Sequence, residues 1–229
     1  MKRSEINAIT QEVKQLIAEQ NFHLPPFAYW SPDQWRSKGE ECREIVDAGL
    51  GWDIIDFGSG KFREIGLALF TIRNGVYGDA RYPKTYCEKL LIVGEGQITP
   101  AHHHVLKTED IICRSGGNLL IELRNASPDG ELLDTPITVS IDGTVRQFSA
   151  GDVVRLQPGE SITLVPYLHH LFWGEEGKGT ALVGEVSTVN DDVGDNIFIP
   201  EVPRFGETEE DEPPLHILCN EYGKFGILS

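Results

Sequence analysis

The sequence predicts a mainly β fold, a sandwich or barrel, with an α-helical extension at its N-terminus. From about residue 52 onward, short apolar runs alternate with glycine, asparagine, aspartate and proline, a texture typical of all-β sandwiches and barrels. Before residue 50, apolar residues instead recur at helical spacings. Neither a repeat of solenoid length nor a low-complexity linker is found. We therefore expect one domain, with a helical extension at 1–50, a barrel at 51–190 and a tail at 191–229 that packs on the barrel or on a partner.

The first helix is expected over residues 4–22. Its apolar side chains lie three or four positions apart and would form one stripe along the helix; they are Ile6, Ile9, Val13, Leu16 and Ile17. Pro25 and Pro26 follow, and proline cannot continue a helix because it lacks the N–H and its ring clashes with the preceding turn.

A second helix is expected over residues 32–48. Ser31 can cap its N-terminus, Pro32 suits the first helical position, and Gln34 completes a capping box. Gly49 is a suitable residue to end it.

The strands are expected where four to eight apolar or β-branched residues lie between turn residues. The runs that meet this description are 65–72, 86–93, 118–123, 137–141, 152–156, 161–167 and 180–186.

The net charge, the apolar runs and the cysteines indicate which partners and which cellular compartment to expect. The net charge of −16 repels phosphate backbones and anionic membranes, so nucleic acid is not an expected partner. No stretch approaches the roughly 20 apolar residues that cross a bilayer, and the start lacks the apolar core of a signal peptide. The four cysteines are scattered, without a CxxC pair, and therefore indicate a reducing cytoplasm; they are Cys42, Cys87, Cys113 and Cys219.

Three consecutive histidines, His102 to His104, lie on a probable strand. Because side chains alternate along a strand, His102 and His104 share one face and His103 takes the other. Two imidazoles on one face can hold a metal ion. Glu109 comes five residues later, far enough for the chain to return in a hairpin and present its carboxylate from the neighbouring strand.

A second histidine pair lies downstream in the stretch YLHHLFW at 167–173. Either His169 or His170 can supply a fourth ligand, and spacing alone leaves that choice open. Five of the seven histidines fall in these two clusters, which favours a metal site over a chance surface run. Three imidazoles and one carboxylate suit manganese, iron, nickel, cobalt or zinc.

The first cluster resembles the first motif of the cupin superfamily, which reads G, five residues, H-x-H, three or four residues, E, six residues, G. Here Gly96, His102, His104, Glu109 and Gly116 fill every position. The resemblance implies a double-stranded β-helix, the cupin jelly-roll barrel.

The second cupin motif is matched less closely. Gly151 and Pro158-Gly159 are present, but the turn reads P-G-E, and the histidine comes later than usual. The resemblance favours His170 as the ligand, because H-x-F-W begins there, with His169 facing away.

A closer resemblance covers most of the chain. It rests on YCEKLLIVGEGQITPAHHHVLKTEDIICRSGGNLLIEL, on PGESITLVPYLHHLFWGEE and on GEVSTVNDD, together with SPDQW and the acidic tail. The sequence is similar to the D-lyxose isomerase family of cupin sugar isomerases. The resemblance implies a homodimer that uses a divalent metal, typically manganese, with cobalt, nickel, iron or zinc as alternatives. It also implies interconversion of D-lyxose and D-xylulose, and of D-mannose and D-fructose.

Aldose–ketose isomerisation through a cis-enediol needs a group that removes the C2 proton and groups that stabilise negative charge on the sugar oxygens. Lys107 lies beside Glu109, Lys89 on the preceding strand, and Glu185 on a late barrel strand. These three are the catalytic candidates, with the lysines as stabilising cations and Glu185 as the base. A hydride shift between C1 and C2 is the rival route, more natural with two metal ions, whereas ligands for one are found.

Other side chains are candidates for binding the sugar. Asp110 follows Glu109, and Arg204 and Glu209 in the tail could close over the substrate as a lid. Phe172 and Trp173 are expected in the core rather than stacked on a sugar ring.

Two further functions share these ligands. An iron-dependent cupin dioxygenase is the main alternative, although the polar candidates favour a sugar site. A non-catalytic sugar-binding cupin is the other, and the complete set of metal ligands argues against it.

Overall fold

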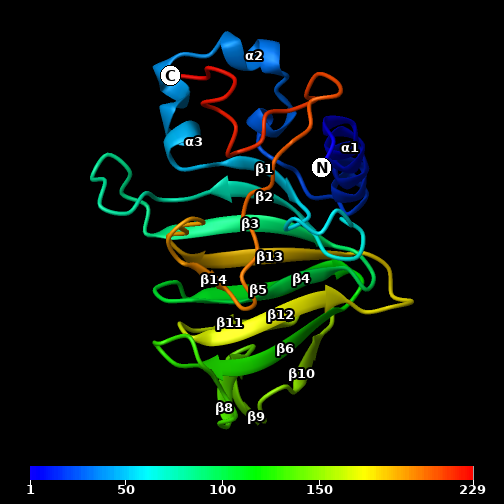
Figure 1. Ribbon diagram of the computed structural model, residues 1–229, viewed down its shortest axis with the longest axis vertical. Helices are drawn as coiled ribbons and strands as arrows, with labels where there is room; N and C mark the ends of the chain where they lie inside the picture. The colour runs from blue at the N-terminus through cyan, green and yellow to red at the C-terminus, as the bar shows by residue number, and fades with distance from the viewer. Residues whose placement is uncertain (229) are drawn as a thin grey trace.

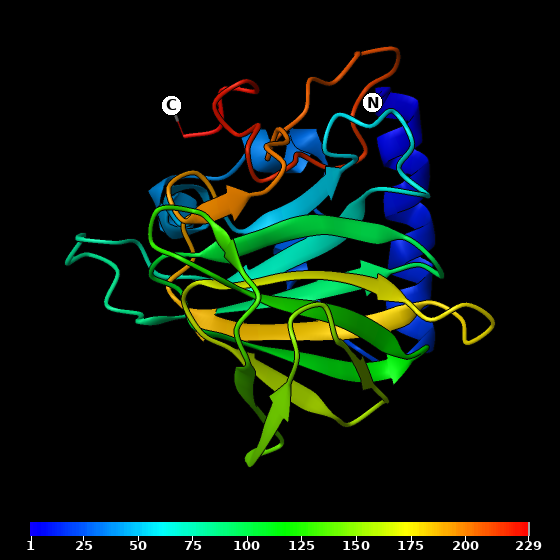
Figure 2. The same cartoon turned by 60° about the horizontal axis from the view of Figure 1, so that its bottom comes forward.

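The computed structural model describes residues 1–228, and strands dominate it. Two antiparallel sheets curl around a common interior (Figures 1 and 2). The eight-stranded sheet has the order β1-β2-β3-β13-β5-β11-β8-β9. Its strands are β1 (Gly51–Ile55), β2 (Leu67–Arg73), β3 (Tyr86–Val93), β13 (Ala181–Thr188), β5 (Glu109–Gly116), β11 (Ser161–Leu164), β8 (Ile137–Ile141) and β9 (Thr144–Phe148).

The six-stranded sheet has the order β10-β6-β12-β4-β14, with β7 paired to β6. Its strands are β10 (Val153–Leu156), β6 (Leu119–Ala126), β12 (Leu168–Gly174), β4 (Ile98–His104), β14 (Asn196–Phe198) and β7 (Leu132–Leu133). From β3 to β6, and again from β9 to β14, successive strands alternate between the sheets. This winding confirms the predicted cupin double-stranded β-helix.

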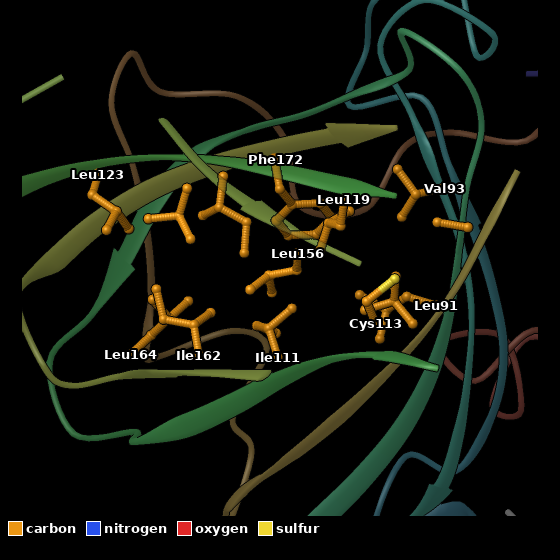
Figure 3. Close-up of a cluster of buried hydrophobic side chains, with 14 of the residues drawn as sticks. Leu91, Val93, Ile111, Cys113, Leu119, Leu123, Leu156, Ile162, Leu164 and Phe172 are labelled. Atoms are coloured by element: carbon orange, nitrogen blue, oxygen red, sulfur yellow. The ribbon is translucent and has the colours of Figure 1, made fainter. Parts of the chain in front are cut away.

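The barrel interior is filled by inward-facing aliphatic side chains of both sheets (Figure 3). Leu91 and Ile111 of one sheet face Leu119, Leu123 and Phe172 of the other, and all five are almost completely buried. Fully burying one such side chain stabilises the fold by about 1.5–3 kcal/mol. Phe172 therefore has the core position predicted for it, whereas its neighbour Trp173 is only half-buried.

Helix α1 (Arg3–Glu19) covers the outside of the eight-stranded sheet near β1 and β2 (Figure 2). Its predicted apolar stripe packs against Trp52 and Phe70, and Trp52 Nε1 donates to Ala28 O at 2.8 Å. The helix is shorter than predicted because Asn21, with φ of 55°, leaves the helical conformation before the prolines are reached.

The predicted helix over 32–48 is broken into three short pieces. They are α2 (Pro32–Arg36), the 3-10 turn η2 (Glu40–Cys42) and α3 (Arg43–Asp47); a further 3-10 turn, η1, spans Pro26–Tyr29. The Ser31–Gln34 capping box is present, with Gln34 N donating to Ser31 Oγ at 3.2 Å. Gly49 ends the last piece with a left-handed φ of 61°. The break at Ser37–Gly39 contains weak helix formers, and it lets Trp35 and Cys42 pack together with Tyr222 of the tail.

The tail contacts both the barrel and the helical extension. Its strand β14 pairs with β4, opposite the three histidines. Further along, Glu209 forms an isolated β-bridge with Lys2, and Leu218 forms one with Trp52. The C-terminal segment therefore lies beside the helices (Figure 1). Within residues 1–228, no helix is both long enough and apolar enough to cross a membrane.

Candidate metal and active site

Three imidazoles converge inside the barrel from neighbouring strands. β4 carries His102 and His104, and β12 places His170 directly opposite His102. One nitrogen from each ring lies within 4.8 Å of the other two. His103 and His169 lie on the other face of the same sheet, with ring centroids 6.1 Å apart. The predicted alternation is therefore confirmed, and His170 rather than His169 joins the cluster.

Backbone carbonyls orient all three rings through Nδ1. The acceptors are Pro100 O for His102 at 2.9 Å, Leu168 O for His170 at 2.9 Å, and Asp195 O for His104 at 3.1 Å. An imidazole that donates from Nδ1 keeps its lone pair on Nε2. Burial lowers the pKa of His102 and His104, so both rings are neutral, as a metal ligand must be.

Glu109 reaches the cluster from the facing sheet. Its Oε1 lies 3.3 Å from Nε2 of His104 and 3.3 Å from Nε2 of His170. The predicted hairpin is wrong, because β4 belongs to the six-stranded sheet and β5 pairs with β13 and β11 in the other. The turn after His104 leads from the six-stranded sheet to the eight-stranded sheet, so candidate ligands of both sheets meet.

A network of buried lysine–carboxylate ion pairs begins at Glu109. Lys107 Nζ lies 2.7 Å from Glu109 Oε2 and 3.0 Å from Glu185 Oε1. Lys89 Nζ lies 3.4 Å from the same Glu185 oxygen and donates to Asn190 Oδ1 at 2.7 Å. Glu185 thus contacts both lysines, although the three predicted catalytic candidates come from three separate segments.

Both lysines remain cationic in this environment. Burial alone would lower the pKa of Lys107, but the carboxylates of Glu109 and Glu185 outweigh it and raise the pKa above its usual value. The pKa of Lys89 is raised against the same burial effect by Asp192 and Glu185. The ammonium groups can therefore act as hydrogen-bond donors and positive charges, but not as bases.

Arg204 of the tail closes this network. Its guanidinium lies 2.7 Å from Asp53 Oδ2 and 3.0 Å from Asp192 Oδ1. Burial opposes ionisation of Asp192, yet Lys89 and Arg204 hold the pKa of its carboxyl well below the usual range. Arg204 was predicted from the sequence as a site residue, whereas Asp53, Asp192 and Asn190 were not. The run NDDVGD at 190–195, which directly follows the strand with Glu185, was the available signal for two of them.

Two predicted binding residues lie elsewhere. Asp110 follows Glu109 on β5 and therefore faces the other side of the sheet, where it accepts a hydrogen bond from Thr163 Oγ1 at 2.6 Å. Glu209 pairs through its backbone with Met1 and Arg3 near the start of α1. Neither lines the cavity, so the structure does not support a substrate contact for either.

Six charged side chains of this network line a common cavity; they are Lys89, Lys107, Glu109, Glu185, Asp192 and Arg204. Apolar side chains form the rest of its wall, among them Phe57, Phe172 and Phe198. The Nε2 atoms of His104 and His170 are buried and have no hydrogen-bond partner. Buried nitrogens are rarely left unpaired, and a divalent cation between them and Glu109 would satisfy both. The donor set therefore fits a first-row metal ion.

A family model described as D-lyxose isomerase matches residues 1–222. The chain belongs to the D-lyxose isomerase family. It is 49% identical over 226 residues to the D-lyxose/D-mannose isomerase of Serratia proteamaculans, with 98% of this chain and 99% of that protein covered. The enzyme of the same name from Escherichia coli O157:H7 is 48% identical, with 98% of this chain and 100% of that protein covered. A member of this family is a sugar isomerase, which removes the dioxygenase and the non-catalytic cupin as alternatives.

Solved structures agree on the fold. The L-ribose isomerase of Cellulomonas parahominis superimposes with a TM-score of 0.59 at 19% identity, covering 92% of this chain and 97% of that one. The L-ribose isomerase of Acinetobacter sp. DL28 gives a TM-score of 0.57 at 18% identity, covering 87% and 92%. The barrel with its N-terminal extension is therefore a scaffold that this family member shares with other sugar isomerases.

Proposed function

We propose that this family member is a metal-dependent aldose–ketose isomerase that interconverts D-lyxose and D-xylulose, and also D-mannose and D-fructose. The observation that carries the proposal is the position of Lys107, whose ammonium bridges Glu109 of the histidine cluster and Glu185 of the cavity wall. The names of the two relatives near 49% identity support this pair of substrates.

The proposed metal ligands are His102, His104, Glu109 and His170. Manganese is the preferred ion, and cobalt, nickel, iron or zinc also suit a set of nitrogen and oxygen donors. When bound, the ion would act as a Lewis acid that polarises the sugar carbonyl and makes the C2 proton more acidic.

Glu185 is the proposed general base. It is a buried carboxylate in the cavity wall that lies outside the ligand set. In the aldose-to-ketose direction it would accept the C2 proton, leaving a cis-enediolate. The proton would then be delivered to C1, while the hydroxyl proton of O2 passes to O1. Lys107 and Lys89 would hold the developing negative charge on the sugar oxygens by donating hydrogen bonds.

Arg204 and Asp192 are the proposed contacts to the sugar hydroxyls furthest from the reacting carbons. Both line the same cavity as Glu185, and a guanidinium beside a carboxylate offers both donors and acceptors. Because each cation here is already paired with a carboxylate, the site suits an uncharged sugar.

We further propose that the enzyme works in the cytoplasm as a homodimer. Its four cysteines are all free thiols, which suits a reducing compartment. The edge strand β9 exposes Val145 at 71%, and an open strand edge is a common site of pairing between chains.

The proposal is tested by ketose formation from D-lyxose and D-mannose with the manganese-loaded protein. Ketose that disappears on chelation and returns with manganese is the expected result. Absence of ketose from both sugars, with bound metal verified, would refute the proposed substrates.

A further inference from the structure

Asp195 is a buried carboxylate next to the histidine cluster but outside it. It lies immediately before β14, the tail strand that pairs with β4, and it is only 2% exposed. Its own N–H donates to Asp191 O at 3.1 Å, which fixes the start of β14.

The side chain of Asp195 holds the turn that follows His104. This turn crosses from one sheet to the other, so its backbone N–H groups lack the partners that a strand ladder would supply. Asp195 Oδ1 accepts from Val105 N at 2.9 Å and Leu106 N at 2.8 Å, and Oδ2 accepts from Lys107 N at 2.9 Å. One carboxylate thus satisfies three consecutive buried or half-buried donors.

The main chain of the same residue holds a metal-ligand candidate. The carbonyl oxygen of Asp195 accepts from His104 Nδ1 at 3.1 Å. Contacts to the outer nitrogen of a metal-binding histidine fix the ring orientation and keep the lone pair on the inner nitrogen. These side-chain and main-chain interactions are coupled, because the hydrogen bonds between the carboxylate and the turn also fix the position of the Asp195 carbonyl.

We infer that Asp195 is a positioning residue that aligns His104 with the metal and Lys107 with Glu109 and Glu185. The inference rests on the proposed metal site and adds to it the residue that links the ligand to the catalytic lysine. Neither His104 nor Lys107 would keep its position if residues 105–107 were free to shift.

Manganese affinity of the full-length protein, measured by competition with a fluorescent chelator, tests the inference. Asp195→Ala should bind manganese roughly 10–100-fold more weakly, the range typical for partners of metal ligands. Asp195→Asn should be affected less, because its amide oxygen still accepts from the turn. With cobalt bound, the visible spectrum of Asp195→Asn should differ from that of the wild type, as expected for a displaced ligand. Thermal denaturation of each metal-free variant verifies that it is folded.

Asp191→Asn is the matched control. Asp191 is exposed in the same segment and accepts from Val193 N and Gly194 N at 3.1 and 3.0 Å. The Asp191→Asn variant should have the manganese affinity and the cobalt spectrum of the wild type. Folded Asp195 variants that bind manganese as tightly as the wild type, or an equal loss in Asp191→Asn, would overturn the inference alone. A wild-type protein that binds no divalent metal would instead overturn the proposed function.

Discussion

Lys107 donates to Glu185 at 3.0 Å across 78 positions of the sequence. The same ammonium lies 2.7 Å from Glu109, so one cation separates two buried carboxylates. Glu109 lies against the histidines and Glu185 does not. This arrangement supports the proposed roles, with Glu109 as a metal ligand and Glu185 as the proton carrier.

Glu185→Gln should remove the base while preserving the shape of the side chain. We expect kcat to fall by about 10²–10⁴-fold, the usual contribution of a general base, with manganese affinity unchanged. Steady-state kinetics and metal titration measure the two effects. Glu88→Gln is the control, since Glu88 lies on the adjacent strand and pairs with Arg73. A Glu185→Gln enzyme with the wild-type kcat would exclude Glu185 as the base.

Lys107→Met should destabilise the metal-free protein strongly. The change leaves Glu109 and Glu185 buried next to each other without their shared cation, and breaking a buried pair costs roughly 3–5 kcal/mol. Denaturant unfolding measures this loss. Lys84→Met, which breaks the surface pair with Glu44, should cost no more than about 1 kcal/mol. Equal losses in the two variants would show that the buried network contributes little.

His102→Ala should bind manganese far more weakly than the wild type. The loss should exceed the roughly 10–100-fold effect of changing an outer partner of a ligand. His103→Ala is the control on the opposite face of β4 and should retain the metal. Metal content after dialysis distinguishes the variants, and metal loss confined to His103→Ala would contradict the observed strand register.

Acid should weaken the contact between the tail and α1. A hydrogen bond from buried Arg3 is the main cause that lowers the pKa of Glu210 from 4.5 to about 2. Because the folded pKa is the lower one, the stabilisation is complete above pH 4.5 and is lost as the pH falls from 4.5 towards 2. Glu210→Gln should therefore be less stable at pH 7 and lose less stability over that interval. The melting temperature as a function of pH measures this, with exposed Glu201→Gln as control. Parallel curves for Glu210→Gln and the wild type would contradict the assignment.

Chelation should lower the melting temperature as well as abolish activity. The ion would join β4, β5 and β12. A ligand that binds only the folded state, at a free concentration of about 100 times its Kd, adds about 2.7 kcal/mol to the free energy of unfolding. Thermal denaturation with and without chelator measures the shift. Full activity after verified removal of the metal would contradict a metal-dependent mechanism.

Local rules were sufficient for the features that depend on one strand or one turn. The period of two along β4 placed His102 and His104 together and His103 apart. The Ser31–Gln34 capping box and the stop at Gly49 formed as predicted, because they depend only on neighbouring residues.

The features that were not predicted depend on contacts between residues far apart in the sequence. Nothing in the sequence around Glu109 reveals that β5 pairs with β11 and β13 instead of β4. In the sequence, Asp53 is a single polar residue within an apolar strand. Its role depends on Arg204, which lies 151 positions later and whose guanidinium is 2.7 Å from Asp53 Oδ2. The helix predicted over 32–48 is broken because Trp35 and Cys42 pack against a tail whose position local sequence cannot give.

The most direct test of the account is isomerisation of D-lyxose by the manganese-loaded enzyme in D₂O, with the hydrogen at C1 of the product xylulose analysed by NMR. Proton transfer through Glu185 predicts solvent deuterium at C1, because the carboxyl proton exchanges with water in the course of turnover. Xylulose formed at the normal rate with the original C2 hydrogen fully retained at C1 would contradict proton transfer and indicate a hydride shift.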